Sequence, residues 1–385
     1  MIKVPFGSIC QLQNGRAFKP TEWAESGVPI VRIQNLNDET KPFNYCNFEV
    51  ESKFHVNSGD LLFSWSGTPG TSFGAFFWNR GLGILNQHIF RVDIDETKVS
   101  KNYLHYAINS KLNHIIEQAH GGVGLKHITK GKLEAVEIPL PPLAEQRRIA
   151  AILDKADAIR RKRQQAIQLA DDFLRAVFLE MFGDPVTNPK GFPVGTIRDL
   201  VESASYGTSA KASETEGAFP ILRMGNITFN GEIDLSDLKY IDLSEKEQPK
   251  YLASKGDLLF NRTNSKELVG KTAVYDRDEP VAIAGYLVRV RANKLGNTHY
   301  ISGYLNSQHG KATLQGMCKS IVGMANINAQ EMQDISIMLP PIELQDKYKE
   351  IVLSVRDKTK VLEFSKEQQV ALFNSLSQKA FSGQL

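Results

Sequence analysis

The sequence predicts an α+β fold with two homologous β-rich domains, separated by two long antiparallel helices that form a coiled-coil spacer with a pseudo-twofold internal repeat. Three observations support this fold. A charged passage that opens with Leu-Pro-Pro occurs twice, at Leu140 and at Leu339. Apolar residues follow each copy at the spacing of a long amphipathic helix. Shorter segments that precede each copy also recur, and they recur in the same order.

These recurring segments indicate an internal duplication. Their separation grows slowly from 191 to 199 residues, so the order is kept and only the loops differ. Such a period is far too long for a solenoid repeat. The pairs are PIVRIQNL at Pro29 with PILRMGNI at Pro220, GDLLFSWSG at Gly59 with GDLLFNRTN at Gly256, IFRV at Ile89 with LVRV at Leu287, GVGLKHIT at Gly122 with IVGMANIN at Ile321, and EIPLPP at Glu137 with SIMLPP at Ser336.

The first β-rich domain is expected at residues 1–142 and the second at residues 184–341. Short apolar runs such as PIVRI, DLLFSW, ILNQHIFRV and EAVEIPL alternate with turns rich in Gly and Asn, which is typical of strands. One helix is expected inside each domain, over residues 101–118 in the first and 298–316 in the second. Each domain is therefore predicted to be α+β.

The two long helices are expected at residues 143–183 and 342–385. Pro141 and Pro142 suit a helix start, and Gly183 and Gly383 suit helix ends. About 40 residues make a rod of roughly 60 Å. The apolar stripe comprises Ile149, Ile152, Ala156, Ile159, Ala166, Ala170, Phe173 and Val177 in the first helix, with Arg163 as a polar exception, and Ile351, Val355, Leu362, Leu372 and Leu376 in the second.

Antiparallel packing of the helices would bury both stripes and hold two similar heads apart like a dumbbell. Such a spacer suits the recognition of a bipartite target with approximate twofold symmetry. B-DNA rises about 3.4 Å per base pair, so a rod of this length would place the heads about one helical turn or more apart.

Composition indicates a globular cytoplasmic protein. The chain is 42% hydrophobic and 23% charged, without a low-complexity tract or a membrane-length apolar run, and its N-terminus lacks the apolar core of a signal peptide. Cys10, Cys46 and Cys318 form no CxxC pair, so reduced structural thiols are expected. The net charge of +3 is small for a protein that binds many phosphates of a nucleic acid. Nucleic-acid binding would therefore need basic residues that cluster locally, or a partner that supplies part of the positive surface.

Several segments resemble the specificity subunits of type I restriction-modification systems. The central passage from LPPLAEQRRIAAILDKADAIRRKR to FLEMFGDPVTNPKGFP carries the resemblance most specifically, and GDLLFNRTNSKELVGKTAVY and the terminal KAFSGQL support it. The resemblance covers the whole chain. It implies that each head is a target-recognition domain that reads one half of a split double-stranded DNA site.

The resemblance also implies the partners. The helices would act as the docking surface for two copies of a DNA adenine methyltransferase subunit, and a translocating restriction subunit would join the complex. S-adenosylmethionine, ATP and Mg²⁺ are then expected on the partner subunits only. The chain itself is expected to need no cofactor and to contact no membrane.

The sequence predicts no catalytic or metal site. An adenine methyltransferase needs an Asn- or Asp-Pro-Pro-aromatic loop, and the nearest match, NPKG at Asn188, favours a structural turn. GGVG at Gly121 follows a helix-like run instead of a strand, so it is no convincing cofactor loop. No histidines pair at metal-ligand spacing. GTPGTSFG at Gly67 leaves two alternatives open, a phosphate cradle and a plain surface loop.

The candidate DNA-reading residues are polar or aromatic side chains on the turns that leave the predicted strands. In the first domain they are Arg32, Gln34, Asn35, Ser64, Trp65, Ser66, Gln87, His88, Lys126 and His127; in the second they are Arg223, Asn226, Asn261, Arg262, Thr263, Asn264, Tyr286, Lys319 and Asn326. After the shared GDLLF the copies diverge to Ser-Trp-Ser and Asn-Arg-Thr, as expected for one scaffold that reads two sequences. Ordinary loop divergence, and a core position for Trp65, remain alternatives.

Some residues fit a structural role better. Arg32 and Arg223 match between the copies, which favours a structural or phosphate-contacting role. The basic run RRKR at Arg160 shares its helix with acidic residues, so a solvated face or a partner surface is favoured over DNA contact. Gln146 and Gln345 recur at the two helix starts, and capping and partner binding both remain open.

The leading hypothesis is a non-enzymatic, sequence-specific DNA-binding subunit that directs a separate methyltransferase and nuclease. The first alternative is a scaffold that binds protein only, which the modest net charge favours. The second alternative is a self-contained DNA methyltransferase, which would need the catalytic loop that the sequence lacks.

Overall fold

The structure is a computed structural model that describes residues 1–68, 71–120, 126–321 and 324–385. The chain divides into two compact units: unit 1 comprises Met1–Arg163 with Ser365–Leu385, and unit 2 comprises Gln164–Phe364. Each unit therefore contains one β-rich domain and a part of both long helices. The boundaries expected from the sequence for the two domains and the two long helices stay a prediction.

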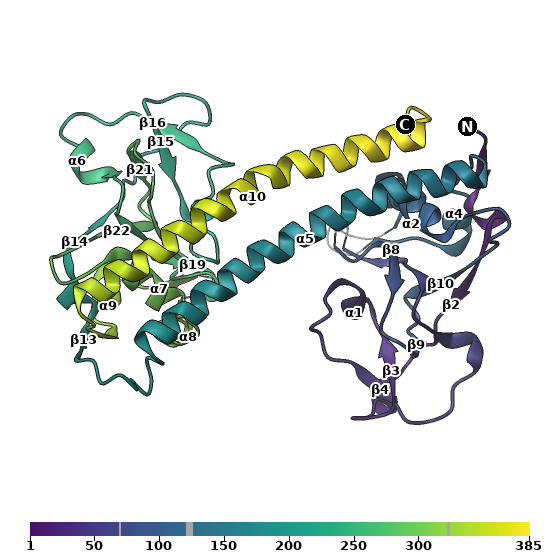
Figure 1. The fold of residues 1–385 in the computed structure, drawn as a ribbon, viewed down its shortest axis with the longest axis horizontal. Helices are drawn as coiled ribbons and strands as arrows, with labels where there is room; N and C mark the ends of the chain where they lie inside the picture. Colours follow the sequence, from purple (N-terminus) through teal and green to yellow (C-terminus); the bar gives the residue numbers. More distant parts are fainter. Residues whose placement is uncertain (69–70, 121–125, 322–323) are drawn as a thin grey trace. The chain divides into compact units, whose positions relative to one another are not determined.

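Unit 1 combines short strands and short helices before the first long helix begins (Figure 1). Its elements are β1 (Lys3–Pro5), β2 (Cys10–Asn14), β3 (Val28–Val31), α1 (Ile33–Asn37), β4 (Asn44–Cys46), β5 (His55–Val56), β6 (Asp60–Ser64), β7 (Ser66–Gly67), β8 (Gly74–Trp78), β9 (Gly83–Leu85), β10 (Ile89–Ile94), α2 (Lys101–Asn109), α3 (Leu112–Gln118), β11 (Lys126–His127), α4 (Lys130–Glu134) and β12 (Glu137–Pro139). The long helix expected after Pro142 is present as α5 (Leu143–Phe182).

Unit 2 follows a similar order before the second long helix, α10 (Ile342–Ser382). Its elements are β13 (Val194–Thr196), β14 (Val201–Tyr206), β15 (Phe219–Leu222), β16 (Lys239–Ile241), α6 (Gln248–Tyr251), β17 (Leu252–Ala253), β18 (Leu258–Asn261), β19 (Thr263–Asn264), β20 (Thr272–Val274), β21 (Val281–Ile283), β22 (Leu287–Ala292), α7 (Thr298–Asn306), α8 (Gln308–Met317), β23 (Lys319–Ile321), β24 (Met324–Asn326), α9 (Ala329–Gln333) and β25 (Ser336–Met338).

The larger sheets repeat between the units, strand for strand. The larger sheets are ordered β2-β10-β6-β8 and β4-β3-β9-β5 in unit 1, and β14-β22-β18-β20 and β16-β15-β21-β17 in unit 2. Neighbouring strands in these sheets are antiparallel except for one parallel pair in each unit, β3 with β9 and β15 with β21. The strands β1 and β12, like β13 and β25, pair the beginning of a domain with its end. The observed α+β architecture is therefore a duplication.

The repeated GDLLF segment forms the central strand of each unit because both of its faces are buried. Leu61 and Phe63 of β6 point into the core beneath α2, whereas Leu62 packs with Trp78 and Ile89 in a second core. Leu258, Leu259 and Phe260 of β18 divide in the same way between two cores. Alternate side chains of a strand point to opposite faces, so a strand buried on both faces is apolar throughout.

The single helix expected inside each domain is a pair of helices. In unit 1 the break lies at Ser110 and Lys111, between α2 and α3. In unit 2 it lies at Ser307, whose hydroxyl accepts a hydrogen bond from the N–H of Gly310 and so caps α8 (3.1 Å). Serine competes with the helix backbone for hydrogen bonds, which favours a new helix start over continuation.

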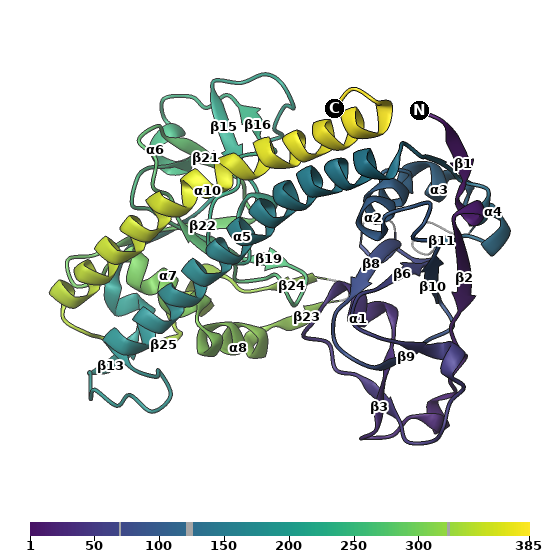
Figure 2. The same cartoon turned by 45° about the vertical axis from the view of Figure 1, so that its right-hand side comes forward.

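Within each unit, the start of one long helix lies beside the end of the other. In unit 1, Ile149 and Leu153 of α5 share a core with Ala380 of α10, as both views show at that end of the helices (Figures 1 and 2). In unit 2, the rings of Phe178 on α5 and Tyr348 on α10 lie 5.6 Å apart. The two helices thus run in opposite directions through each unit.

The expected apolar stripe is only partly buried. Ile159, Phe173 and Leu372 are 51%, 52% and 56% exposed, so their predicted burial was wrong. Leu153 and Phe182 are instead fully buried against the domains. Near the helix ends, the β-rich domains therefore decide which helix face is buried, and a heptad pattern alone does not reveal that contact.

Glycine ends both long helices in the left-handed conformation, with φ of +83° at Gly183 and +81° at Gly383. We expect Gly383→Ala to cost about 1–2 kcal/mol of unfolding free energy, because an L-residue is strained there. Gly183→Ala should cost more, because its Cβ would also lie 2.6 Å from Cγ of Pro189. Equilibrium denaturation tests both, and Gly225→Ala is the matched control because that site is open and has no positive φ.

The helices of the described ranges include none that is both long and apolar enough to cross a bilayer. Cys10, Cys46 and Cys318 are free, and Cys10 and Cys46 are buried. Burial raises the pKa of the Cys10 thiol to about 12, which keeps it protonated and unreactive.

Candidate nucleic-acid interface

A short backbone frame holds Trp65 at the end of the central strand of unit 1. Its N–H donates to the carbonyl of His88 (3.2 Å), and its own carbonyl accepts from the N–H of Ile128 (3.0 Å). These bonds bring together the ends of β6, β10 and β11, which are far apart in the sequence. The side chain of Trp65 is free to vary because only its backbone takes part in these bonds.

Arg262 occupies the same frame in unit 2. Its N–H donates to the carbonyl of Tyr286 (3.0 Å), and its carbonyl accepts from the N–H of Ile327 (2.9 Å). The backbone is therefore conserved between the two copies, whereas the side chains at the three positions differ. Unit 1 presents Trp65, His88 and His127 there, and unit 2 presents Arg262, Tyr286 and Asn326; we call these two sets the reading triads.

The triad of unit 1 is an aromatic cluster. The ring of Trp65 stacks on Phe90 at 5.8 Å and meets the rings of His88 at 5.2 Å and His127 at 6.1 Å. Burial, and then the neighbouring His127, lower the pKa of His88 below its ordinary value. A neutral imidazole offers one donor and one acceptor at its two ring nitrogens, so this cluster combines an apolar face with both hydrogen-bonding roles.

The triad of unit 2 is polar and cationic. The guanidinium of Arg262 lies 4.8 Å from the ring centroid of Tyr206, and its Nη2 donates to Oδ1 of Asn326 (3.4 Å). Nδ2 of Asn326 donates in turn to Oγ1 of Thr263 (3.1 Å). Nε of Arg262 is buried without a hydrogen-bond partner in the described chain. The guanidinium of Arg262 is thus positioned by Tyr206 and Asn326.

The triad of unit 2 opens into a groove of about 1070 Å³. Seven of the nine residues predicted for the second domain line it, namely Arg223, Asn226, Arg262, Thr263, Asn264, Tyr286 and Asn326. Its basic side chains are Lys211, Arg223, Lys239, Arg262 and Lys271, against the carboxylates of Asp234 and Asp237. The groove therefore contains more basic than acidic side chains, a balance that favours contact with phosphates.

The matched arginines are engaged with their own domains. Nη1 of Arg32 donates to Oδ1 of Asn44 (2.8 Å), and its guanidinium lies 5.1 Å from the ring centroid of Trp23. Nη2 of Arg223 pairs with Oδ2 of Asp237 (2.8 Å). Because both side chains have local partners, the geometry favours the structural alternative over base reading.

Six of the candidate residues are buried in this structure: Asn35, Ser64, Ser66, Asn226, Asn261 and Thr263. Of these, Asn226 and Thr263 also line the groove of unit 2. The two asparagines have a repeated structural task. Oδ1 of Asn35 accepts from the N–H of Arg32, and its Nδ2 donates to the carbonyls of Lys41 and Pro42. Asn226 binds the N–H of Arg223 and the carbonyls of Asp234 and Asp237. These bonds favour a structural role for the two asparagines, and base reading by any of the six residues stays a prediction.

Asn35→Ala and Asn226→Ala should each destabilise their unit by about 1–3 kcal/mol, because buried backbone groups lose their partners. The DNA sequence preference of the protein should not change. Thermal unfolding and selection of bound sequences from a randomised pool measure the two effects. Asn37→Ala, at an exposed position on α1, is the control, and an altered preference in Asn226→Ala at normal stability would show that this amide reads bases.

The surroundings of Gln34, Gln87 and Lys126 favour neither base reading nor a structural role. Nε2 of Gln34 donates to the carbonyl of Pro42 (3.3 Å), and Nε2 of Gln87 lies 3.1 Å from Nε2 of His88. Lys126 is half-buried on β11. The side chain of Lys319 lies outside the described residues, as do residues 121–125, which include the Gly121 motif.

Comparison with known proteins identifies the family. The model of the type I restriction-modification DNA specificity domain matches residues 2–169 and 189–371. The chain belongs to the type I restriction-modification specificity subunits. The EcoBI specificity subunit of Escherichia coli is 24% identical over all of this chain and 86% of its own length. The EcoKI specificity subunit of E. coli K12 is 25% identical over 73% of this chain and 64% of its own length.

A solved structure agrees with the fold. The crystal structure of a type I restriction-modification S subunit from M. genitalium matches with a TM-score of 0.62 over 99% of this chain and 96% of that one, at 15% identity. Specificity subunits provide DNA target recognition and are not themselves catalytic, so this chain is a recognition subunit and not an enzyme.

Other motifs of the specificity subunit have local roles. Nδ2 and Oδ1 of Asn188 bind the carbonyl and the N–H of Phe192, so NPKG forms a turn, as expected. Arg160 and Arg161 both pair with Asp157 on the surface of α5. Residues 69–70 of the Gly67 segment lie outside the description, so both of its interpretations stay open. Across the described ranges no group of three or more metal-ligating side chains comes together.

Sequence reasoning missed several groove residues of the specificity subunit. Ser209 and Lys211 follow β14, Lys239 begins β16 and Lys271 precedes β20, and all four line the groove of unit 2. Lys271 is half-buried, which lowers its pKa, and its Nζ donates to the carbonyl of Met224 (2.9 Å). The small and polar TSAKAS after β14 was the available signal for Lys211; Lys239 and Lys271 have no distinctive local pattern.

Proposed function

We propose that the chain recognises a bipartite site in double-stranded DNA, one half with each unit, and directs a separate adenine methyltransferase and a restriction subunit to that site. The observation that carries the proposal is the pair of reading triads. One backbone frame presents Trp65, His88 and His127 in unit 1 and Arg262, Tyr286 and Asn326 in unit 2. Two copies of a scaffold with different side chains at equivalent positions fit two different half-sites.

The chemistry of the triads predicts how the half-sites differ. The guanidinium of Arg262 offers two donors to O6 and N7 of guanine, and the amide of Asn326 can bind N6 and N7 of adenine. Trp65 offers an apolar face to a thymine methyl group, and His88 and His127 each offer a donor or an acceptor. We therefore expect a guanine in the half-site read by unit 2 and an A·T pair in the one read by unit 1.

Partner subunits supply the chemistry in this proposal. S-adenosylmethionine would bind the methyltransferase, of which two copies match the two halves of the chain, and ATP and Mg²⁺ would bind the restriction subunit. The reading triads hold neither a nucleophile poised beside a base nor a cofactor loop. Their role is to bind and orient DNA for the partner.

A map of adenine methylation across the genome, with and without this gene, tests the proposal in a cell that has the matching methyltransferase. We expect a split motif that disappears on deletion and returns on complementation. Unchanged methylation, with the methyltransferase shown to be active, would contradict the recognition role and favour a scaffold that binds protein only.

We further propose that α5 and α10 form an antiparallel coiled-coil spacer that relates the two units by a pseudo-twofold axis. Their similar lengths of 40 and 41 residues, and their opposite directions within each unit, support this. Such a spacer would set the number of unread base pairs between the half-sites.

Shortening both helices by one heptad tests the spacer. Removal of residues 160–166 and 361–367 keeps the heptad register and shortens the rod by about 10 Å. That length equals about three base pairs of B-DNA. We expect the methylated motif to keep both halves and to lose about three base pairs from its gap. An active complex with an unchanged gap would disprove the ruler function.

A further inference from the structure

Lys271 differs from the other lysines and arginines that line the groove of unit 2. Arg223 and Lys239 each pair with a carboxylate, and Lys211 is exposed. Lys271 is half-buried, and none of the described residues forms an ion pair with it. Burial lowers the pKa of its ammonium group. A buried charge is usually paired, so a half-buried cation without a carboxylate in a binding groove indicates a ligand.

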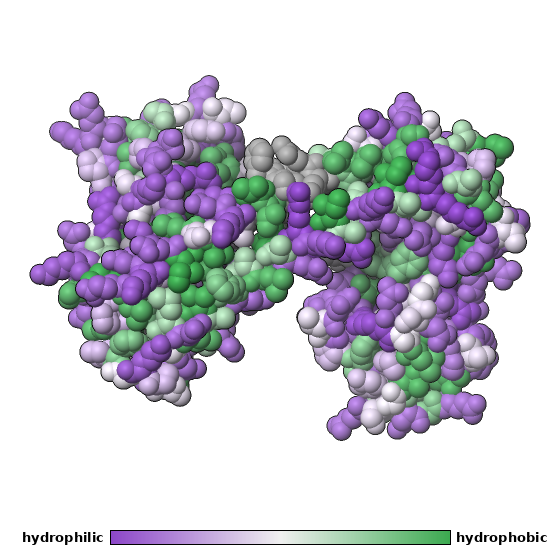
Figure 3. All heavy atoms as spheres, viewed as in Figure 1, coloured by the Kyte–Doolittle hydropathy of each residue, from purple (hydrophilic) through white to green (hydrophobic). Residues whose placement is uncertain are grey.

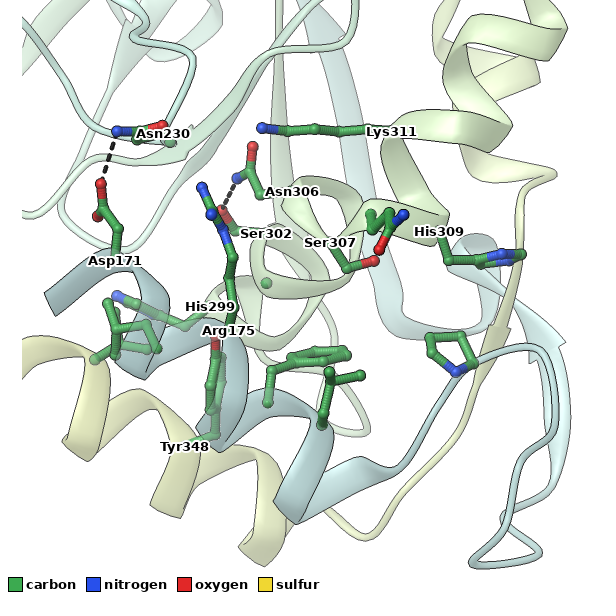
Figure 4. A pocket seen from close by; sticks show the side chains of 18 of the residues that line it. Asp171, Arg175, Asn230, His299, Ser302, Asn306, Ser307, His309, Lys311 and Tyr348 are labelled. Carbon is green, nitrogen blue, oxygen red and sulfur yellow. Dashed lines mark hydrogen bonds between the residues drawn. The ribbon is translucent and has the colours of Figure 1, made fainter. Parts of the chain in front are cut away.

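Other lysines of unit 2 do not share these surroundings. Figure 3 shows hydrophilic side chains over much of the face turned to the viewer, so charge alone does not distinguish a lysine. Lys311 is also half-buried, but it lines a separate cavity of about 520 Å³ that contains the carboxylate of Asp171 (Figure 4). Burial, and then Arg175, lower the pKa of Lys311 to about 8, and Asp171 opposes that shift. Lys271 has no such carboxylate beside it in the described ranges.

The ammonium group of Lys271 is held at the wall of the groove. Its Nζ donates to the carbonyl of Met224 (2.9 Å), which belongs to the 3-10 turn after β15. The backbone carbonyl of Lys271 accepts from the N–H of Asn261 (2.9 Å), the residue directly before Arg262. An ammonium group has three N–H donors, and the described residues bind only one of them. The side chain is thus fixed at its far end, and two donors remain for a ligand.

The duplication places a glycine at the equivalent position of unit 1. Ser64 and Asn261 both follow the repeated GDLLF segment. Ser64 lies opposite Gly74 in the neighbouring strand, just as Asn261 lies opposite Lys271. Gly74 has a φ of +137°, and a Cβ there would lie 3.0 Å from Oδ1 of Asn109. Unit 1 therefore has no side chain at this position, and such a difference fits the recognition of two different half-sites.

A fixed, half-buried lysine suits the edge of a base better than a phosphate. Phosphate contact needs mainly a positive charge, which the exposed Lys211 already offers. Ordering a free lysine side chain costs up to about 2 kcal/mol, whereas Lys271 is ordered before DNA binds. Lysine binds guanine by donating to O6 and N7, and these two acceptors match the two donors that Lys271 retains.

We propose that Lys271 reads a second guanine in the half-site of unit 2, through O6 and N7 of that base, in addition to the guanine assigned to Arg262. This inference rests on the proposed function and adds to it one reading residue and one base pair. Unit 1 has no matching contact, because Gly74 takes the place of Lys271 there.

Selection of bound sequences from a randomised pool, by the complex of the full-length chain with its methyltransferase, tests the role of Lys271. Lys271→Met keeps an unbranched stem but removes the donors, so the preference for guanine at one base pair should fall about tenfold or more. Lys271→Gln keeps a donor for the carbonyl of Met224 and should lose the same preference. This second variant keeps the test valid if Lys271→Met folds poorly.

Two other lysines of unit 2 provide the comparisons. Lys211→Met removes an exposed charge inside the groove, so it should weaken binding to all sequences alike and lower the salt dependence by about one phosphate contact. Lys246→Met is the matched control, because Lys246 is exposed and does not line the groove. It should select the same motif as the unaltered chain.

The outcomes separate the two proposals. If the unaltered complex selects no motif, the proposed function fails and the role of Lys271 fails with it. If the unaltered complex selects a split motif and both Lys271 variants select the same one, the role of Lys271 is wrong and the proposed function stands. Weaker binding to all sequences alike would make Lys271 a phosphate contact and would also overturn the inference. Loss of guanine at one base pair, different from the base pair that Arg262→Lys affects, supports it, whereas loss at the same base pair would disprove a second guanine.

Discussion

Replacing the reading triad of unit 2 with that of unit 1, by Arg262→Trp, Tyr286→His and Asn326→His, is expected to abolish recognition of one half-site and leave the other unchanged. Each specific base contact contributes about 1–3 kcal/mol of discrimination. Loss of the contacts should therefore lower affinity for the original site about 100-fold or more. The frame should survive, because the bonds that hold residue 262 to residues 286 and 327 involve backbone atoms only.

Selection of bound sequences by the assembled complex measures this effect, and the adenine methylation map measures it in the cell. Arg277→Ala is the control, because it removes a positive charge from an exposed position outside the groove. It should lower affinity equally for all sequences. If the triad variant folds, binds DNA and keeps both halves of the motif, then the three positions do not read bases.

The single change Arg262→Lys refines this test. Lysine keeps the charge but cannot form the two parallel hydrogen bonds that a guanidinium makes to guanine. A phosphate contact should therefore tolerate the change, with a salt dependence close to that of the unaltered chain. A base contact should not tolerate it, and discrimination at a single base pair should fall about tenfold or more.

Gln146→Ala and Gln345→Ala are expected to be the most destabilising single changes among those considered, at about 2–4 kcal/mol each. Oε1 of Gln146 accepts from the N–H of Ser100 (2.8 Å), and its Nε2 donates to the carbonyls of Lys98 and Pro141. Gln345 binds the N–H of Asn297 and the carbonyls of Leu295 and Pro340 in the same way. Alanine would leave these backbone groups without a partner in a buried place.

Each glutamine ties the start of a long helix to the start of a domain helix, so the damage should be local to one unit. Hydrogen exchange resolved along the chain should show faster opening around α2 and the start of α5 in Gln146→Ala, and around α7 and the start of α10 in Gln345→Ala. Gln378→Ala, at an exposed position on α10, is the control. If both variants have normal stability and normal hydrogen exchange, capping is not the role of these glutamines. Partner binding would then explain why a glutamine recurs at the start of each long helix.

Much of the fold followed from the duplication. Residues 29 to 36 and 220 to 227, for example, were paired from sequence alone, and they form equivalent strands, followed by α1 in unit 1 and by a 3-10 turn in unit 2. The long helix α5 was predicted from its caps and spacing. The break between α7 and α8 was not, because a serine such as Ser307 is compatible with a helix until its hydroxyl finds an N–H to cap.

The candidate site was predicted less completely. Trp65 and Arg262 were predicted as candidates because the copies diverge after an identical strand. Asn35 and Asn226 also have polar side chains and also follow strands, yet their amide groups form hydrogen bonds with the backbone of their own loops. Residue type does not distinguish these cases, because a polar side chain at a strand end can bind a base or the backbone beside it.

The sequence by itself determined the duplication, the α+β class, the caps of the long helices and the positions at which the two copies differ. These are local or repeated features, and pattern and propensity suffice for them. Only the tertiary structure decided which helix faces are buried, which polar side chains remain available, and that Lys211 and Lys271 share a groove with Arg262. Those properties depend on contacts between segments far apart in the chain, and a linear pattern does not specify such contacts.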